Sequence, residues 1–324
     1  MRGDKPPWLD DIKLIVFLHC QHWTGYVHNS FDDLAEAIIQ LGPSMTEGGV
    51  MFVVLGWEGP YYRHPLASLA PAQSLGGHDA FSRLCETAKD VGGRLLLFSP
   101  LCVADVECVE REGWERGVLK RPWGETAWMN WCDWDGDLEN EGYPFMNMGF
   151  EPFRKYLIEK YTRLIEQYPI DGLYFDITNY WEDDLLFDHL EGTRSLVAEL
   201  HKAFPDVVCC GENWYDQLLG IFPFFGEPGN IMGPYDCMLR YCRGGAYVAS
   251  PSPLGSGGVH EKGRGYLGAA TLKECNVPYI TIAEDWRDCI ATLASRCAAA
   301  QSWSAEKNSV PAPELTRLFS GEIV

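Results

Sequence analysis

The stretch KLIVFLHCQHW, residues 13–23, decides between the two parallel-sheet folds that this chain could adopt. Residues 13–19 are almost entirely apolar, which is typical of a strand that is buried on both faces. An open doubly wound sheet would place a glycine-rich phosphate turn directly after this strand. The residues found there, His19 to Trp23, include no glycine. The sequence therefore favours a closed barrel over an open sheet.

Working outward from this stretch, apolar runs alternate with amphipathic runs along most of the chain. Buried strands are predicted at residues 13–19, 50–55, 94–99, 172–176, 207–211, 237–242, 246–250 and 278–283. Helices are predicted at residues 31–41, 79–91, 153–168, 191–204, 266–275 and 286–300. About eight such units in 324 residues predict the α/β class and a (β/α)8 TIM barrel. Residues 1–324 are expected to form a single domain, with residues 102–150 as a long insertion after the third strand.

Composition narrows the range of partners. Lys and Arg total 26 against 46 Asp and Glu, so the formal net charge is −20. Such a chain repels phosphate backbones and anionic lipids, which argues against nucleic-acid and membrane partners. The 12 Trp residues are more than a core needs, and flat aromatic side chains suit the faces of sugar rings. A carbohydrate substrate is therefore expected, while the oligomeric state is left open.

The cysteines indicate buried thiols rather than a disulfide framework. Several of the 12 cysteines lie inside apolar runs, and no paired zinc-type spacing occurs. The first residues are polar and rich in proline, without a signal-peptide core, and no apolar run is long enough for a membrane span. A cytoplasmic location is the default expectation, and a secreted protein whose signal peptide has been removed would have the same sequence.

A barrel of this kind carries its chemistry where the strands end. Polar and aromatic residues follow five of the predicted strands, and they are candidates for contacts with substrate. They are His19, His22, Trp23, Trp57, Glu58, Tyr174, Asn179, Trp181, Asn213, Trp214, Asp285 and Trp286.

The strongest pair of candidates is Asp176, at the end of DGLYFD, and Glu212, in CGENW. Side chains alternate along a strand, so Asp176 shares the inward face with Tyr174 while the apolar neighbours pack outward. Glu212 follows the next predicted strand. Two carboxyl groups on neighbouring strand ends suit the separation of roughly 5–5.5 Å that a retaining glycosidase uses. The alternative is that both are merely polar residues that cap helices or bind a structural cation.

These two strands resemble the fourth and fifth strands of (β/α)8 retaining glycoside hydrolases, in particular the alpha-amylase superfamily and the endo-α-N-acetylgalactosaminidase-like barrels. The resemblance implies Asp176 as the nucleophile and Glu212 as the general acid/base. It covers about 45 residues in detail and only the architecture elsewhere. The chain departs from the amylase pattern because Tyr174 stands where that pattern has Arg, and because a His-Asp pair near the seventh strand is missing.

The mechanism adds two expectations. Glu212 should be the less solvated of the two acids, with Trp214 nearby to raise its pKa, and Asp176 should be hydrogen-bonded. A third carboxylate should orient the sugar hydroxyls, and its candidates are Glu58, Asp236 and Asp285.

The predicted insertion is rich in tryptophan, and long structured loops over a barrel mouth are usually functional. Trp128 and Trp131 are the favoured sugar platforms and Trp134 is next, with Trp114 and Trp123 as further candidates. The alternative is a small core that holds the insertion together. Asp133, Asp135 and Asp137 invite a calcium site, but the positions of the EF-hand glycine and glutamate hold Leu138 and Pro144.

Two other classes of function stay open. His19 and His22 could start a metal site, although substrate hydrogen bonding is the preferred interpretation and no metal or other cofactor is expected. A metal-dependent barrel hydrolase is therefore one alternative, and a carbohydrate-binding barrel without turnover is the other. A serine hydrolase is not supported, because the chain has no GxSxG elbow.

Overall fold

The computed structural model describes most of the first two thirds of the chain and parts of the last third. The described residues are 5–22, 25–60, 70–129, 143–178, 180, 184–213, 215–226, 243–247, 276–283 and 286–306. Eight candidate site residues lie outside these ranges, as does the acidic loop at 133–137. The eight are Trp23, Trp131, Trp134, Asn179, Trp181, Trp214, Asp236 and Asp285.

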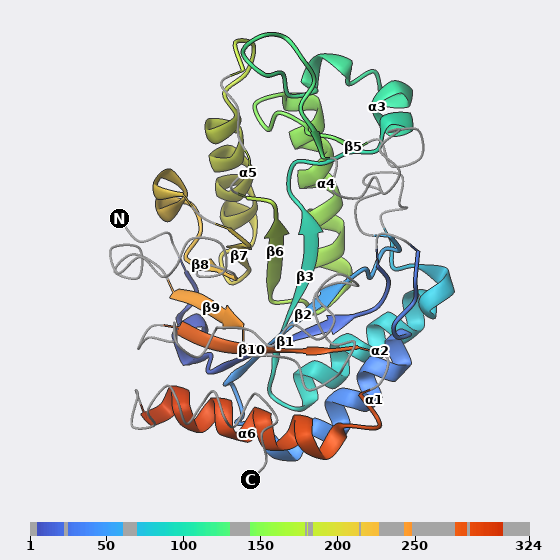
Figure 1. The fold of residues 1–324 in the computed structure, drawn as a ribbon, viewed down its shortest axis with the longest axis vertical. Helices are drawn as coiled ribbons and strands as arrows, with labels where there is room; N and C mark the ends of the chain where they lie inside the picture. The colour runs from blue at the N-terminus through green and yellow to red at the C-terminus, as the bar shows by residue number, and fades with distance from the viewer. Residues whose placement is uncertain are drawn as a thin grey trace.

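Parallel strands form the centre of the molecule (Figure 1). They are β1 (Leu14–His19), β2 (Val50–Leu55), β3 (Arg94–Pro100), β6 (Gly172–Asp176), β7 (Val208–Gly211), β8 (Phe224–Phe225), β9 (Arg243–Tyr247) and β10 (Asn276–Ile282). Their order is closed, β1-β10-β9-β8-β7-β6-β3-β2, so the first strand pairs with both the second and the last. Strands β1, β2 and β6 are buried along their whole length, as expected where helices cover the outer face.

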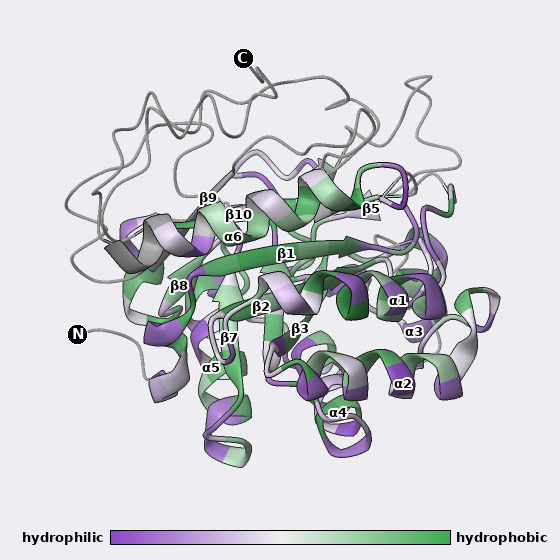
Figure 2. Ribbon diagram, turned by 90° about the horizontal axis from the view of Figure 1, so that it is seen from below, coloured by the Kyte–Doolittle hydropathy of each residue, from purple (hydrophilic) through white to green (hydrophobic). Residues whose placement is uncertain are grey.

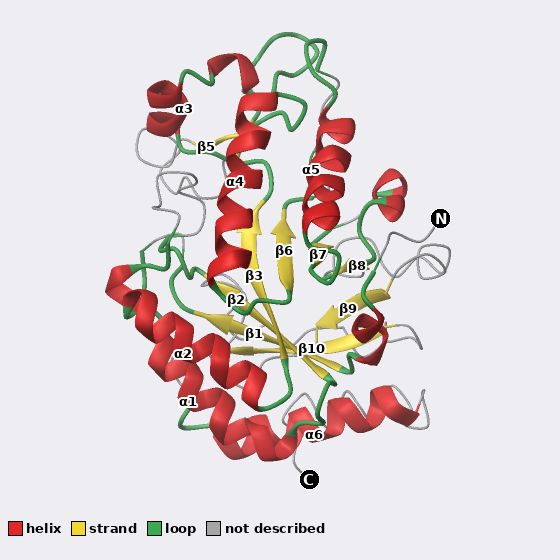
Figure 3. Ribbon diagram, turned by 180° about the vertical axis from the view of Figure 1, so that it is seen from behind, coloured by secondary structure: helices red, strands yellow, loops and turns green. Residues whose placement is uncertain are grey.

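The long helices lie outside the strands, as the view from behind shows (Figure 3). They are α1 (Phe31–Leu41), α2 (Gly77–Asp90), α4 (Glu151–Gln167), α5 (His189–Ala203) and α6 (Ile290–Glu306). Short 3-10 helices are η1 (Pro7–Asp11), η2 (Gly42–Ser44), η3 (Gln73–Leu75), η4 (Glu115–Gly117) and η5 (Asp216–Gly220). The strands are mostly hydrophobic while the helices alternate between polar and apolar faces, so the core lies between the two layers (Figure 2).

The start of α1 illustrates how local sequence sets an element. The side chain of Ser30 accepts a hydrogen bond from the backbone N–H of Asp33 at 3.2 Å. The Asp33 carboxylate accepts one from the backbone N–H of Ser30 at 3.0 Å, which completes a capping box. The apolar residues behind this cap are buried against the barrel. The predicted helix over residues 31–41 is confirmed, and it begins and ends at the predicted residues.

The α/β class and a parallel sheet are confirmed, and the predicted strands up to residue 211 lie where the sequence placed them. The predicted strand at 237–242 lies outside the described residues, and the strand that follows β7 in the sheet is β8, whose two residues Phe224–Phe225 are too few to produce a pattern. The predicted strand at 246–250 overlaps β9, which begins earlier, at Arg243. The predicted helix at 266–275 lies outside the described residues, so the regular alternation of eight strands and eight helices stays a prediction.

The insertion after β3 contains α3 (Val106–Glu112) and a two-stranded antiparallel pair, β4 (Trp128–Met129) with β5 (Tyr143–Pro144). These elements lie beyond the tip of β3 (Figure 1). The Trp114 ring is buried against Phe153 and Tyr156 of α4, with ring centroids 5.5 Å apart in both contacts. Trp114 therefore anchors the insertion to α4.

No helix in the described ranges combines the length and the apolar character that a membrane crossing needs. The cysteines of the described ranges are free thiols, all buried except the half-buried Cys289.

Candidate active site

The floor of the barrel mouth is an aromatic layer on the inward faces of the strands. The Tyr174 ring contacts Phe17 at 5.4 Å and Phe98 at 5.8 Å between centroids. Its hydroxyl lies so close to Gly226 that a Cβ atom there would come within 1.6 Å of it. Tyr174 is 1% exposed, so it closes the barrel beneath Asp176, which follows it on the same face.

A single peptide group links the two candidate acids. The backbone N–H of Ile177, the residue directly after Asp176, donates to Glu212 Oε2 at 3.0 Å. Standard backbone geometry then puts this oxygen within about 5.5 Å of the Asp176 Cα atom. Carboxyl oxygens of the two acids therefore lie within about 9 Å of each other. This range includes the spacings of both retaining and inverting glycosidases.

The link depends on a strained residue. Ile177 has a φ angle of 56°, in the left-handed region that β-branched side chains rarely adopt. Its neighbours hold it there, because Leu101 N–H donates to the Asp176 carbonyl at 3.2 Å and the Cys102 thiol lies 3.8 Å from the Ile177 carbonyl. Strain of this kind persists only where the surroundings impose it, and it clusters at functional sites.

A second bridge fixes the backbone after Glu212. The Thr178 hydroxyl accepts from the backbone N–H of Asn213 at 3.1 Å and donates to the Asn213 carbonyl. The Asn213 side-chain amide donates to Glu212 Oε2 at 2.8 Å. Glu212 Oε2 thus accepts two hydrogen bonds from rigidly held groups, which orient the carboxylate before substrate arrives.

The Thr178 bridge gives a testable prediction. Thr178→Val keeps the shape of the side chain but leaves the Asn213 N–H without its partner, so a loss of about 1–3 kcal/mol in the free energy of unfolding is expected. We also expect kcat to fall, because Glu212 is less firmly oriented. Urea unfolding and steady-state kinetics measure the two effects.

Thr193→Val is the control for stability, since the buried Thr193 hydroxyl only donates to the His189 carbonyl at 3.0 Å and its loss leaves no N–H unpaired. Thr178→Ser should restore both properties. Equal losses in the two valine variants would contradict a special role for the bridge.

Solvation of the two acids differs from the sequence expectation. Glu212 was expected to be the less solvated, but Asp176 is 2% exposed and Glu212 is half-buried. The reason is positional: Asp176 is the last residue of β6 and lies inside the barrel, whereas Glu212 stands just beyond the end of β7. Burial therefore does not by itself assign the acid and nucleophile roles.

The Cys102 thiol is a neighbour of the pair that the sequence gave no reason to select. Burial raises its pKa well above the ordinary value, and the negative charge of Asp176 raises it further. The thiol stays protonated and neutral beside Asp176.

His19 also faces the mouth. It lies two residues after Phe17 on the same face of β1 and is 1% exposed. Neither of its ring nitrogens has a hydrogen-bond partner within the part of the chain that the structure describes. Burial, and then the neighbouring His28 and His22, lower its pKa well below the ordinary value, so its ring is neutral. A neutral imidazole can both donate to and accept from a hydroxyl group.

His22 is fully buried next to this residue. Its backbone N–H donates to the Tyr26 carbonyl at 2.8 Å, and its ring centroid lies 6.2 Å from that of His28. Among the described residues, no three His, Cys, Asp or Glu side chains gather closely enough to hold a metal ion.

Trp57 and Glu58 face away from the mouth. After β2 the chain turns at Gly56, where φ is 65° and a Cβ atom would collide with the Gln21 carbonyl. Trp57 is 1% exposed and its indole N–H donates to the Phe98 carbonyl at 2.8 Å. Glu58 forms a buried ion pair with Lys160 of α4. The structure places both residues between the barrel and its helices, so we propose neither as a contact to sugar.

The Glu58–Lys160 pair is expected to dominate local stability. Burial lowers the pKa of Lys160 and Glu58 opposes this shift, with the side chains 0% and 2% exposed. Lys160→Met would leave Glu58 as an uncompensated buried charge, so a loss of about 3–5 kcal/mol is expected in denaturant unfolding. The double variant Lys160→Met, Glu58→Gln should recover much of it. A double variant as unstable as the single one would contradict this account.

Three other candidate tryptophans have different environments. Trp286 is fully buried beneath the guanidinium of Arg287, 4.3 Å from the ring centroid. Trp123 is 69% exposed, and its N–H donates to Glu125 at 2.8 Å. Trp128 is half-buried in β4. Of these, Trp128 stays the proposed sugar platform.

No known family model matches this sequence, and no curated protein matches it. Its fold is similar to that of an alpha-N-acetylgalactosaminidase from Bifidobacterium bifidum, with a TM-score of 0.68 and 12% identity over 93% of this chain and 53% of that one. The chain thus spans about half of that enzyme. An alpha-amylase from Lactobacillus plantarum matches with a TM-score of 0.58 and 11% identity over 97% and 80% of the two chains. An alpha-galactosidase from Geobacillus stearothermophilus matches with a TM-score of 0.57 and 14% identity over 93% of this chain and 44% of that one. At these identities the comparisons show that the chain shares the barrel fold of these glycoside hydrolases.

Proposed function

We propose that this chain is the catalytic barrel of a retaining glycosidase that hydrolyses glycosides with Asp176 and Glu212. The observation that carries the proposal is the hydrogen bond from the Ile177 backbone N–H to the Glu212 carboxylate, which ties Glu212 to the residue directly after Asp176 on the neighbouring strand end. Similarity of fold to glycoside hydrolases supports it. The separation bound of about 9 Å is compatible with it.

In the first step, Glu212 donates a proton to the glycosidic oxygen while an Asp176 oxygen attacks the anomeric carbon. The bond to the leaving group breaks, and the sugar is held as a glycosyl ester of Asp176. Oε1 of Glu212 is the oxygen proposed to carry the proton, because Oε2 already accepts two hydrogen bonds. In the second step Glu212 takes a proton from water, which attacks the same carbon and frees Asp176.

Substrate contacts are proposed from the residues that face the mouth. His19 presents two buried ring nitrogens to sugar hydroxyls, and Asn213 lies beside Glu212. Tyr174 forms the floor below. Trp23, Asn179, Trp181, Trp214, Asp236, Asp285 and Trp131 stay predictions from the sequence.

A panel of 4-nitrophenyl α- and β-glycosides tests the proposal, with N-acetylgalactosamine, galactose and glucose as the sugars. The neighbouring structures are named as alpha-specific enzymes, so α-glycosides come first. Release of nitrophenol by the purified protein, but not by Asp176→Asn, is the expected result. Sugar binding without release would leave a binding barrel, and activity that disappears on chelation would favour a metal-dependent hydrolase.

A further inference from the structure

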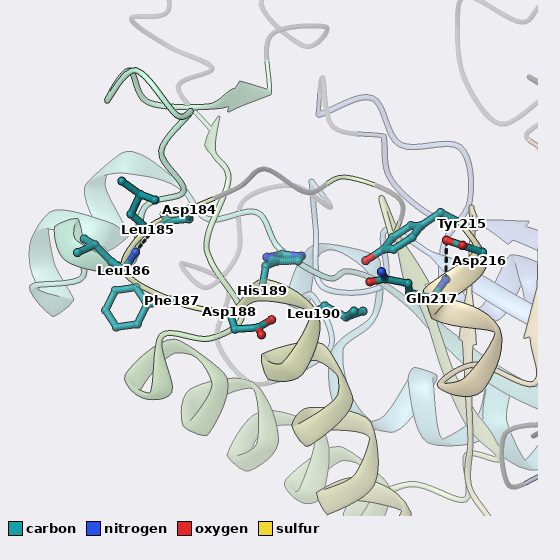
Figure 4. Close-up of a pocket in the computed structure, with 10 residues that line it drawn as sticks. All are labelled: Asp184, Leu185, Leu186, Phe187, Asp188, His189, Leu190, Tyr215, Asp216 and Gln217. Atoms are coloured by element: carbon teal, nitrogen blue, oxygen red, sulfur yellow. Dashed lines mark hydrogen bonds between the residues drawn. The ribbon is translucent and has the colours of Figure 1, made fainter.

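A groove of about 580 Å³ lies between the loops that follow β6 and β7, the two strands at whose ends Asp176 and Glu212 lie (Figure 4). One side is formed by the residues that lead into α5, and the other by the first residues of η5. They are Asp184, Leu185, Leu186, Phe187, Asp188, His189 and Leu190 on one side and Tyr215, Asp216 and Gln217 on the other.

The groove and the catalytic pair are built on the same two loops. Tyr215 is the third residue after Glu212, so their Cα atoms lie within about 11 Å of each other. Burial raises the pKa of Tyr215 to about 12, and Cys102, the thiol beside Asp176, contributes to that shift. The groove therefore begins within reach of the catalytic pair, and an aglycone that extends from the pair along these two loops would enter it.

The groove is held rigidly on its α5 side. Lys120 of the insertion donates its backbone N–H to Asp184 at 3.2 Å, and the Asn147 amide donates to the Phe187 carbonyl at 2.9 Å. Gly192 of α5 lets the backbone pack so closely that a Cβ atom would come within 2.1 Å of Met148. A groove formed in advance costs little ordering on binding.

At the centre of the groove, His189 presents a neutral hydrogen-bond donor. The side chain is 6% exposed, and its Nδ1 accepts from the Met148 backbone N–H at 3.2 Å, which places the proton on Nε2. Burial lowers its pKa to about 4, so it carries no charge at neutral pH. No protein partner for Nε2–H occurs among the described residues, and the ring lines the groove (Figure 4).

The groove combines negative charge with apolar surface. The carboxylates of Asp184, Asp188 and Asp216 accept backbone N–H groups, and no Lys or Arg side chain of the described ranges pairs with them. Leu185 and Leu186 are 92% and 61% exposed at one end. Such a lining repels anions, and the exposed leucines and His189 suit a group with an apolar end and a hydrogen-bond acceptor.

We propose that this groove binds the leaving group of the substrate and selects glycosides with a neutral, apolar aglycone over those with an anionic one. This inference rests on the proposed glycosidase function. It adds the substrate class: the sugar occupies the mouth, while the apolar part of the aglycone contacts Leu185 and Leu186 and its polar atoms face His189.

The experiment uses three α-linked substrates for each of the three sugars of the panel. A glycosyl fluoride has no aglycone to occupy the groove and reports the chemistry alone. The 4-ethylphenyl and 4-(carboxymethyl)phenyl glycosides have leaving groups of similar acidity and differ in charge. We expect kcat/KM to be at least about tenfold higher for the ethylphenyl glycoside.

Two surface substitutions in the groove should change this preference. Leu186→Asp should lower kcat/KM for the ethylphenyl glycoside about tenfold, and Gln217→Lys should raise it for the carboxymethylphenyl glycoside by a similar factor. Both should leave hydrolysis of the fluoride unchanged. Ile39→Asp is the matched control, because Ile39 of α1 is also 61% exposed and lies away from the groove.

The outcomes separate the two proposals. If the fluoride is hydrolysed but Leu186→Asp behaves like Ile39→Asp, the groove proposal is wrong and the glycosidase proposal stands. If no fluoride is hydrolysed, the glycosidase proposal fails. Ligand-observed NMR with free 4-ethylphenol and 4-hydroxyphenylacetate then tests whether the groove binds the neutral phenol. Binding of ethylphenol alone, lost in Leu186→Asp, would support it, and no binding to the wild type would overturn it.

Discussion

Asp176→Asn is expected to reduce kcat at least about 10³-fold on every glycoside that the protein hydrolyses, glycosyl fluorides included. Asparagine keeps the size and the hydrogen-bonding oxygen of the side chain but cannot form the glycosyl ester. A substrate with a good leaving group therefore does not restore kcat in this variant. Initial rates measured on a fluoride and on an alkyl glycoside of the same sugar should fall by similar factors.

A control at the other end of the same strand separates chemistry from folding. Asp171, just before β6, accepts from the Arg94 side chain and from the Leu95 backbone N–H, each at 2.9 Å. Asp171→Asn should lower the unfolding midpoint while each folded molecule keeps its turnover. Asp176→Asn should lose its turnover while it keeps the wild-type unfolding midpoint. Wild-type turnover of alkyl glycosides by Asp176→Asn would contradict the two-carboxylate mechanism, because these substrates need both acids.

The sequence was most informative where one element buries a continuous apolar face. Strand β6 and helix α1 have clear periods and clear ends, because Gly172 and Asp176 bound the strand and Ser30 caps the helix. Strand β8 has two residues and pairs with β7 through Gly211 alone, so no window of sequence can show it. Its position is set by closure of the barrel, which is a property of all the strands together.

Part of the candidate site could be predicted from strand alternation. Alternation predicted that Tyr174 and Asp176 share the inward face of their strand; Tyr174 packs against Phe17 and Phe98 there, while the catalytic roles of Asp176 and Glu212 stay predictions. The orientation of Trp57 and Glu58 could not be predicted. It depends on the turn at Gly56 and on the buried partner Lys160, which lies far from Glu58 in the sequence. The left-handed Ile177 gives no sequence signal either, since isoleucine is a residue that normally avoids that conformation.

The surroundings of the two acids differ. Asp176 is the more buried acid. Glu212 Oε2 accepts hydrogen bonds from Ile177 and Asn213. A buried carboxyl group suits a proton donor and a hydrogen-bonded one suits a nucleophile, which is the reverse of the assignment that the resemblance implies, so a substitution at each acid has to be compared on the same substrates.

Glu212→Gln is expected to lower kcat/KM on alkyl glycosides by about 10²–10⁴-fold, the range of general acid catalysis, and on glycosyl fluorides far less. An alkoxide leaves poorly without a proton, whereas fluoride leaves without one. The variant keeps the side chain in place, because its amide oxygen can still accept from the Ile177 N–H and the Asn213 amide. The measurement is kcat/KM for both substrates in wild type and variant.

The second step supplies an independent readout of the same residue. Glu212 is the base that activates water, so in Glu212→Gln the glycosyl ester on Asp176 should persist and limit turnover of the fluoride. Azide attacks without a base, and adding it should restore turnover and yield a glycosyl azide that retains the configuration of the substrate. Asp176→Asn forms no ester, so azide should not restore its turnover by this route. If instead Asp176→Asn keeps fluoride hydrolysis and Glu212→Gln abolishes it on all substrates, then Glu212 is the nucleophile and the deeper acid, Asp176, is the proton donor.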